Sequence, residues 1–138
     1  MKLKNNLSFF YSFCVAILFY PTVGTPFSDH HALILCLLSF YSFVLAINEK
    51  KNFYWFLIPV LLGFSFLTKQ APTVYIVFFI TFISIIYFVY SQNLTNFFFA
   101  VAGFITILTV FFILLFINDI KFNDFFIQYF AYPKSLGG

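Results

Sequence analysis

The chain has few charged residues and, among them, no arginine. Charged residues make up 8% of its 138 positions, whereas a soluble domain carries about 25%. So small a number cannot cover a water-facing surface, which excludes a soluble globular domain. The 63% hydrophobic content excludes a disordered segment. The net charge of +3 is spread along the chain and is too small to indicate a nucleic-acid partner.

Signatures of soluble catalytic and metal sites are also missing from the sequence. It contains no phosphate-binding glycine loop, no nucleophile elbow, no CxxC or HExxH motif and no internal repeat. Its two cysteines, Cys14 and Cys36, lie in apolar runs, where cysteine is usually a small buried apolar residue. Their spacing predicts neither a metal site nor a redox pair.

What the sequence does have is a set of long uncharged stretches, with a mean hydropathy of +1.02. These stretches contain 24, 19, 17 and 49 residues, at positions 5–28, 30–48, 52–68 and 70–118. A membrane-crossing helix needs about 20 apolar residues, so the first three hold one span each. The fourth holds two spans, separated by the polar residues 91–96. The sequence therefore predicts an integral membrane protein, an all-α bundle of five transmembrane helices at about 7–21, 29–47, 53–68, 73–91 and 97–117.

Lysine placement predicts which side of the membrane each loop faces. The lysines before the first span and the lysine pair at 50–51 lie on the same side of a five-span chain. The positive-inside rule makes that side the cytoplasm. The loop 21–28, Lys69 and the residues after Asn118 then face outside. Lysines ahead of an apolar run also fit a cleaved signal peptide, but no small-x-small site ends the run, which favours a retained span.

A polar segment on the outer side contains the first candidate site. Asp29, His30 and His31 stand at the start of the second predicted span, after two prolines and a glycine. Asp29 has a common structural role as a helix cap, with the two histidines at the interface. Alternatively, a carboxylate and two imidazoles at the mouth of a bundle are able to bind a metal or to move a proton. Both interpretations stay open at this point.

Lys69 and Gln70 form the second candidate site, at the end of the third predicted span. Lys69 is the only charged residue between Lys51 and Asp119. As a structural residue it snorkels to the interface before a turn at Pro72. As a functional residue it is a fixed cation for a phosphate, with Gln70 as a hydrogen-bonding neighbour. Both candidate sites lie on the same face of the predicted bundle, where a carboxylate and an ammonium suit a substrate with a charged headgroup and a lipid tail.

The residues after the fifth span, about 119–132, predict an amphipathic helix in the membrane interface. Its aromatic residues recur at helical spacing and are expected to dip into lipid: Phe122, Phe125, Phe126, Tyr129 and Phe130. The polar residues point elsewhere: Lys121, Asn123, Asp124 and Gln128. Asp124 has the chemistry of an active-site carboxylate, but a solvated polar face is the commoner role of such a residue.

Residues 20–72 resemble the GT-C membrane glycosyltransferases, in particular the family of dolichyl-phosphate-mannose-protein mannosyltransferases and bacterial lipid A aminoarabinose transferases. The resemblance rests on a proline-rich outer loop, an acidic residue that opens a helix, a lysine-rich inner loop and a helix-end motif. The matching residues are Asp29, Gly63, Leu67, Thr68 and Lys69. The resemblance implies transfer of a sugar from a polyprenyl-phosphate donor to a lipid, glycan or protein acceptor. It places this activity at the periplasmic face of a bacterial inner membrane.

The same resemblance implies roles for the candidate residues. Lys69, beside Gln70, would hold the lipid phosphate, and Asp29 would contact the acceptor or a metal, with His30 and His31 assisting. The implied mechanism is an inverting displacement at the anomeric carbon, in which a carboxylate deprotonates the acceptor and cations stabilise the departing phosphate. It leaves the use of a divalent metal open. The family's acidic residue in the first outer loop has no counterpart before Asp29, so we expect a piece of a longer enzyme, inactive alone.

A second class of function is a small non-catalytic membrane protein, such as a transporter piece or an assembly subunit. It predicts that alanine is tolerated at Asp29 and Lys69, and that no lipid-linked sugar binds. A proton-coupled carrier would also use membrane carboxylates and histidines. Here those groups are predicted at the mouth of the bundle rather than at the bilayer midplane, which counts against transport.

Overall fold

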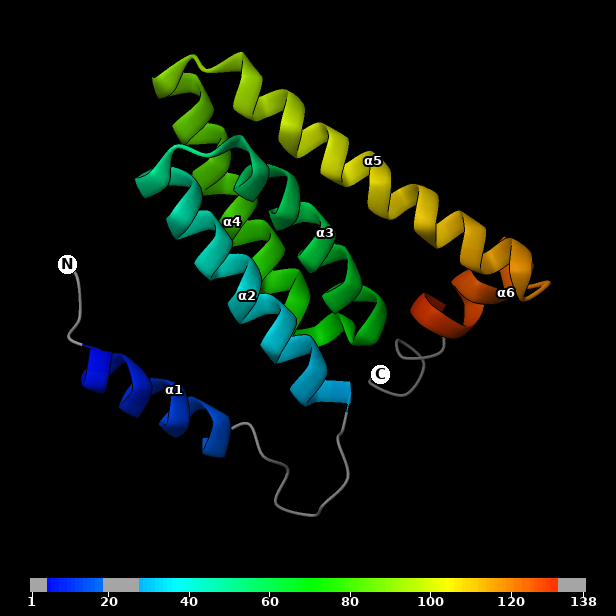
Figure 1. Ribbon diagram of the computed structural model, residues 1–138. Helices are drawn as coiled ribbons and strands as arrows, with labels where there is room; N and C mark the ends of the chain where they lie inside the picture. Colours follow the sequence, from blue (N-terminus) through cyan, green and yellow to red (C-terminus); the bar gives the residue numbers. More distant parts are fainter. Residues whose placement is uncertain (1–4, 19–27, 132–138) are drawn as a thin grey trace.

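The computed structural model describes residues 5–18 and 28–131, and every regular element in these ranges is helical (Figure 1). The elements are α1 (Asn5–Leu18), α2 (Ser28–Glu49), α3 (Asn52–Thr68), α4 (Gln70–Ser91), α5 (Leu94–Ile117), α6 (Phe122–Phe126) and the π-helical turn η1 (Ile127–Ala131). The prediction of an all-α fold is therefore confirmed.

Within the described residues, three helices are long and apolar enough to cross a membrane. They are α2, the Thr73–Ser91 part of α4, and α5. The helix α3 is equally apolar in character but has 17 residues. The first predicted span corresponds to α1, although residues 19–21 of that prediction lie outside the described residues. Predicted and observed helices agree within a few residues, because a backbone in lipid must satisfy its hydrogen bonds within one continuous helix.

The helix α3 is the centre of the bundle. It packs most extensively against α2 on one side and against α5 on the other, while α4 contacts α2 and α3 and touches α5 only slightly. In Figure 1, α1 lies beside the lower end of α2, apart from the other helices. The four helices α2 to α5 therefore form the packed body of the molecule, with α4 and α5 on two different sides of α3.

Aromatic and aliphatic side chains fill the space between α2, α3 and α4. Trp55 of α3 is 1% exposed, and its ring meets Phe43 edge-on at 5.9 Å and stacks on Tyr87 at 5.0 Å. The buried cluster around it contains Phe43, Ala46, Trp55, Ile58, Leu62 and Ile80. Because lipid tails are as apolar as these side chains, their contribution here comes mainly from close packing rather than from exclusion of water.

Two glycines bring α3 and α5 into close contact along a seam. A side chain at Gly103 of α5 would overlap the Phe56 carbonyl oxygen and lie 2.8 Å from Pro59 Cγ. One turn further on, a side chain at Gly63 of α3 would overlap Ile107. Small residues permit this approach of two backbones, which is the usual way that helices associate in membranes.

The turn between α4 and α5 is shorter than the predicted polar break at 91–96. Gln92 ends α4 in the left-handed conformation, with φ of 50°, and its N–H donates to the Phe88 carbonyl at 3.0 Å. Asn93 then caps α5, since its side-chain oxygen accepts the Asn96 N–H at 3.3 Å. Only two residues therefore lie between the helices, each with a defined capping role.

We expect Gln92→Gly to raise the free energy of unfolding in detergent micelles by about 0.5–1 kcal/mol. A left-handed φ costs a residue with a Cβ about 1–2 kcal/mol, and the added freedom of glycine in the unfolded chain offsets part of that gain. Denaturant unfolding followed by Trp55 fluorescence measures the change. Ser91→Gly is the matched control, because Ser91 is helical and should lose stability there. Equal shifts in both variants would contradict the conformational explanation.

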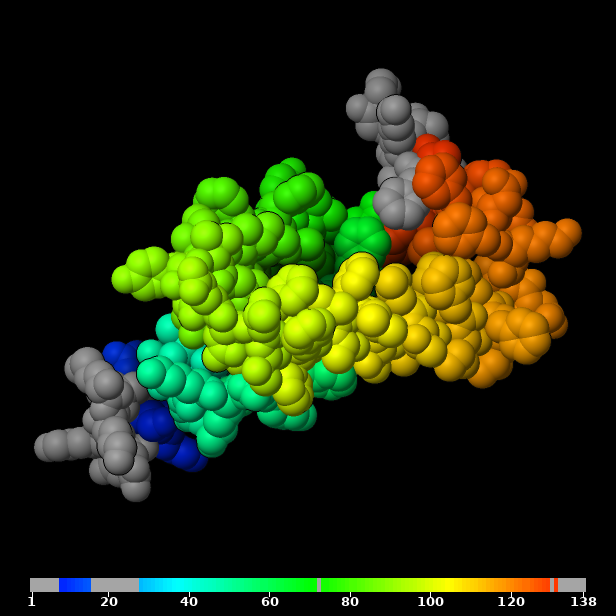
Figure 2. Space-filling view, turned by 90° about the horizontal axis from the view of Figure 1, so that it is seen from above, coloured from blue at the N-terminus to red at the C-terminus, as the bar shows by residue number. Residues whose placement is uncertain are grey.

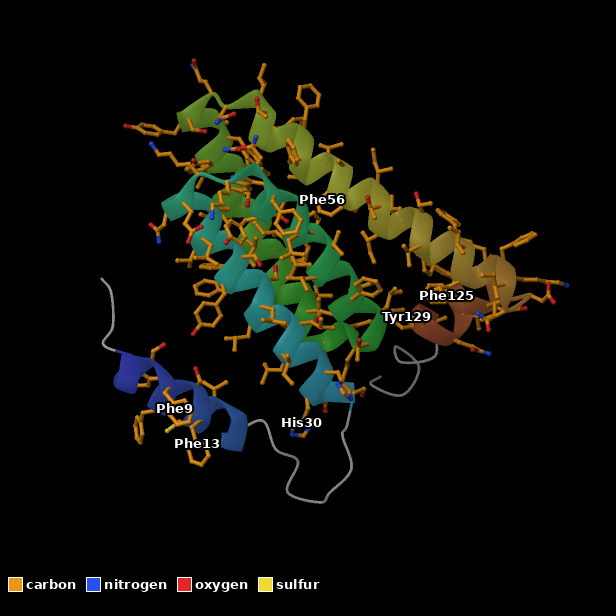
Figure 3. All side chains as sticks on the ribbon, in the orientation of Figure 1. Phe9, Phe13, His30, Phe56, Phe125 and Tyr129 are labelled. Atoms are coloured by element: carbon orange, nitrogen blue, oxygen red, sulfur yellow. The ribbon has the colours of Figure 1, made fainter. Side chains whose placement is uncertain are left out.

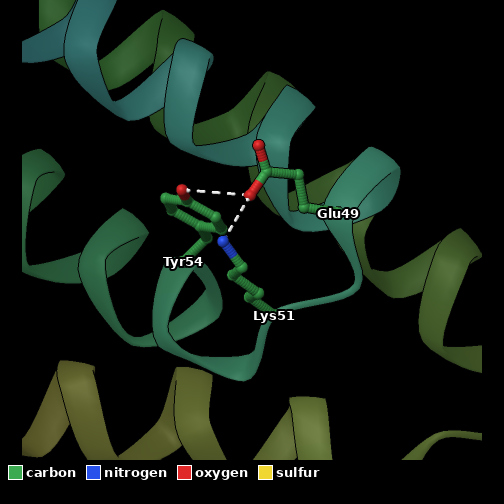
Figure 4. Close-up of polar contacts among 3 residues, drawn as sticks. All are labelled: Glu49, Lys51 and Tyr54. Carbon is green, nitrogen blue, oxygen red and sulfur yellow. Dashed lines mark hydrogen bonds and ion pairs between the residues drawn. The ribbon is translucent and has the colours of Figure 1, made fainter.

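A small polar group closes the turn between α2 and α3 at the same end of the bundle (Figure 4). The Lys51 ammonium lies 2.9 Å from the Glu49 carboxylate, and the Tyr54 hydroxyl donates to the same carboxylate at 3.4 Å. The hydrogen bond to Glu49, followed by the charge of that carboxylate, raises the pKa of Lys51. Both side chains are largely exposed, so the pair adds little to stability.

Candidate functional site

Residues predicted as two separate candidate sites meet at one end of the bundle. Asp29 in the first turn of α2 forms an ion pair with Lys69, which lies between α3 and α4. The two side chains are 56% and 42% exposed respectively, so a ligand has access to both charges. The structure thus brings together the carboxylate and the ammonium that the sequence pattern assigned to one face.

Lys69 is the whole connection between α3 and α4. It has an extended backbone, with φ of −158° and ψ of 134°, and its N–H donates to the Ser65 carbonyl at 3.0 Å. The predicted turn at Pro72 is wrong, because α4 already begins at Gln70. Proline is tolerated in the first turn of a helix, where its missing N–H has no partner to lose. The lysine therefore stands at the tip of a tight helical hairpin.

The two histidines lie beside this ion pair in the chain, in the first turn of α2. His30 is half-buried and His31 is exposed. Figure 3 shows His30 at the end of α2 where the helix begins. Across residues 5–18 and 28–131, no group of three or more His, Cys, Asp or Glu side chains is arranged to hold a metal ion. The described part of the site therefore offers acid–base and ion-pair chemistry, with Asp29 and Lys69 as its charged members.

Gln70 binds the C-terminal segment rather than lying beside Lys69 as a second ligand-binding group. Its side-chain amide donates to the Tyr129 carbonyl, and the Tyr129 hydroxyl donates to the Phe66 carbonyl. The Tyr129 ring meets Phe66 edge-on at 5.8 Å and stacks on Phe125 at 4.9 Å (Figure 3). Burial raises the pKa of the Tyr129 phenol. These contacts attach η1 to the junction of α3 and α4.

The predicted interfacial helix at 119–132 differs from the structure in extent. The helical segment begins at Phe122, and the π-helical η1 takes over at Ile127; residue 132 lies outside the described residues. Phe125 of the predicted aromatic face packs on Phe111 of α5 at 4.9 Å, whereas Phe122 and Phe126 are exposed; contact of this face with lipid stays a prediction. Asp119, with φ of 51°, turns the chain back toward the bundle. The polar residues are exposed, as predicted: Lys121, Asn123, Asp124 and Gln128.

An apolar cavity of about 440 Å³ lies between α3 and α5, and along α3 its lining reaches Leu67, two residues before Lys69. Its walls come from α3, α4, α5 and α6, and among its lining residues are Phe66, Leu67, Phe111, Phe122, Phe125 and Phe126. A second cavity of about 250 Å³ shares Pro59, Leu62, Thr81 and Phe104 with the first. The two cavities therefore adjoin along α3, where α4 and α5 diverge. Figure 2 shows α5, in yellow, running beside α4, in green, with the orange α6 at one end.

A buried polar cluster beneath Lys69 was missed by the sequence analysis. Ser65 Oγ lies 2.7 Å from Thr73 Oγ1 and 3.1 Å from Cys36 Sγ. All three side chains are at most 1% exposed. Cys36, which the sequence indicated as an apolar filler, is thus part of a hydrogen-bonded group. The sequence offers one indication of this cluster: Ser65 and Thr73 stand four residues before and four residues after Lys69.

Comparisons with protein-family models, with curated proteins and with solved structures gave no match to this chain. The features that bear on function are therefore those of the site itself: an accessible ion pair at one end of a membrane helix bundle, and an apolar cavity whose lining on α3 ends two residues before Lys69.

Proposed function

We propose that the chain belongs to an integral membrane glycosyltransferase, which moves a sugar from a polyprenyl-phosphate donor to an extracytoplasmic acceptor. The observation that carries this proposal is the exposed Asp29–Lys69 ion pair, in a bundle whose apolar cavity reaches Leu67, two residues before Lys69. In this proposal α1 and α3 also cross the membrane, which gives five spans. The end of the bundle that holds the ion pair faces the periplasm of a bacterial inner membrane.

Lys69 is the proposed partner of the donor phosphate. A fixed cation stabilises the negative charge that builds on a departing phosphate, and such stabilisation is usually a large part of catalysis. Phe66 and Leu67, which line the cavity, precede Lys69 by three and two residues. Along α3 the apolar lining thus comes within two residues of the lysine that would hold the phosphate, and in this proposal the lipid chain occupies the cavity. This continuity favours a lipid phosphate over a soluble anion.

Asp29 is the proposed contact for the acceptor. In the structure its carboxylate pairs with Lys69, and a phosphate bound to the lysine would compete for the same ammonium. Donor binding would then free the carboxylate to hydrogen-bond an acceptor hydroxyl, with His30 and His31 beside it. The acceptor oxygen attacks the anomeric carbon, the bond from that carbon to the phosphate oxygen breaks, and the hydroxyl proton passes to a carboxylate base.

We expect Asp29→Ala and Lys69→Ala each to lower transfer at least about 100-fold, the scale of losing one electrostatic contact to the transition state. Transfer is measured in proteoliposomes holding the full-length gene product, with a panel of polyprenyl-phosphate hexoses and pentoses. Lys121→Ala is the control, since Lys121 is an exposed lysine on the turn before α6. Membrane insertion of all three variants should match the wild type. Wild-type turnover by both site variants would refute the proposal.

The alternative of a non-catalytic membrane protein is favoured by one observation: the two charges already satisfy each other. In that case the ion pair only joins α2 to the α3–α4 hairpin. Either alanine variant would then leave function intact, and no lipid-linked sugar would bind to the wild-type protein.

A further inference from the structure

Two hydrogen bonds hold the backbone of Lys69, one with the main chain of α3 and one with the buried cluster of Ser65, Thr73 and Cys36. The Lys69 N–H donates to the Ser65 carbonyl at 3.0 Å, and the Lys69 carbonyl accepts from the Thr73 hydroxyl at 2.8 Å. The side chain of Lys69 reaches the surface, whereas its peptide groups are fixed from below. The backbone of Lys69 is thus held by hydrogen bonds, while its side chain is able to reach a ligand.

The same cluster also holds the helix that carries Asp29. The Ser65 hydroxyl donates to the Ala32 carbonyl at 2.8 Å, and Ala32 is completely buried three residues after Asp29. Cys36, one turn further along α2, contacts Ser65 at 3.1 Å. The cluster therefore connects to the backbone of α2 and to the backbone of Lys69, the two elements that bear the ion pair.

The three side chains of the cluster supply three hydrogens for four short contacts, so the hydrogens are shared among them. A hydroxyl or a thiol donates a single hydrogen, and one assignment uses each hydrogen once. In that assignment the Cys36 thiol donates to Ser65, the Ser65 hydroxyl to the Ala32 carbonyl, and the Thr73 hydroxyl to the Lys69 carbonyl. The 2.7 Å contact between the Ser65 and Thr73 oxygens becomes a hydrogen bond only when one of these hydroxyls turns away from its carbonyl. No water is available inside a bilayer to replace a lost donor.

We propose that Ser65 and Thr73 are positioning residues that set the relative placement of Asp29 and Lys69. The relevance of this role to sugar transfer rests on the proposed function, whereas the positioning of Asp29 and Lys69 by the cluster does not. Hydrogen bonds between helices stabilise membrane proteins only modestly. The main effect of the cluster is therefore geometric: it fixes where the ammonium and the carboxylate stand when a phosphate arrives.

The first arm of the test measures placement without any ligand. Spin labels are attached to Leu33→Cys on α2 and Ala71→Cys on α4, both exposed positions, in a Cys14→Ser background of the full-length protein in nanodiscs. Pulsed electron resonance then gives the distribution of distances between the labels. Thr73→Val should broaden this distribution, and Thr73→Ser should restore the wild-type width.

The second arm measures binding of a short-chain polyprenyl monophosphate, the leaving group shared by every sugar donor. Thr73→Val should raise its Kd about tenfold, the scale of one misplaced charge-assisted contact. Thr73→Ser should bind within about twofold of the wild type. Thr109→Val is the matched control for both arms, because the Thr109 hydroxyl donates only to its own helix, at the Ile105 carbonyl, 2.9 Å away.

The two arms separate failure of this inference from failure of the proposed function. An unchanged distance distribution in Thr73→Val overturns the positioning role, whatever the ligand result. If Thr73→Val does not fold, Ser65→Ala is judged by the same distances. If the wild-type protein binds no polyprenyl monophosphate, the proposed function is contradicted, and the spin-label distances alone then decide the positioning role.

Discussion

Replacing Gly103 with leucine should lower the free energy of unfolding by about 3 kcal/mol, the upper part of the range for overpacking a tight interface. A Cβ at this position overlaps the Phe56 carbonyl oxygen and crowds the Pro59 ring. Neither neighbour can rotate away, since one is backbone and the other is a ring fixed to it. The helices α3 and α5 must therefore separate. Reversible unfolding in mixed micelles, followed by Trp55 fluorescence, measures the loss.

The neighbouring alanine provides the control for this change. Ala102 is exposed on the same helix, one residue from Gly103, so Ala102→Leu adds the same side chain outside the seam. Its effect should stay within about 0.5 kcal/mol. Equal losses from both variants would show that added bulk on α5, and not the contact with α3, is responsible. Full stability of Gly103→Leu would contradict the described helix packing itself.

Trp55→Ala should also cost about 3–5 kcal/mol, the range for removing a large buried ring. Trp55 is 1% exposed and contacts aromatic rings from α2 and α4, so its loss leaves a hole between three helices. Within the described residues its Nε1 is buried without a hydrogen-bond partner. Removing that N–H is therefore not itself costly, and Trp55→Phe should lose only about 1 kcal/mol by retaining most of the ring.

Circular dichroism has to follow these two variants, because Trp55 is the only tryptophan in the sequence. The quantity to compare is the loss of unfolding free energy in Trp55→Ala and in Trp55→Phe. A phenylalanine variant as unstable as the alanine variant would mean that the indole N–H makes a needed contact. An alanine variant of wild-type stability would mean that α2, α3 and α4 do not pack around this ring.

The sequence predicted the positions of the helices best, because an apolar segment in lipid has few structures open to it. Charge gaps located the helices because lipid tolerates long apolar runs only as helices. Alternation of the spans then put Asp29 and Lys69 at the same end, where the structure shows their ion pair. Hydropathy does not indicate which polar side chains within the apolar helices form hydrogen bonds with one another. Ser65 and Thr73 therefore looked like any other hydroxyls in an apolar helix, and their shared cluster emerged only from the packing.

The C-terminal segment shows a second limit of sequence reasoning. An aromatic face of a short amphipathic helix has the same spacing whether it meets lipid or protein. The deciding feature was the reversal at Asp119, which returns α6 to the bundle, together with the contacts of Gln70 and Phe66 to Tyr129. A left-handed aspartate and hydrogen bonds across some 60 positions leave no periodic signal in a sequence.

The one-residue link between α3 and α4 limits which motions can occur around Lys69 and how fast they are. A single extended residue spans about 3.3–3.6 Å, so the two helix ends it joins have no slack with which to open or close. The junction of α3 and α4 therefore lacks a loop that could move on the nanosecond-to-microsecond timescale. What can still move is the side chain of Lys69, whose ammonium sits on a flexible four-carbon stem. Its response to an arriving anion is a rotamer change, which takes picoseconds to nanoseconds.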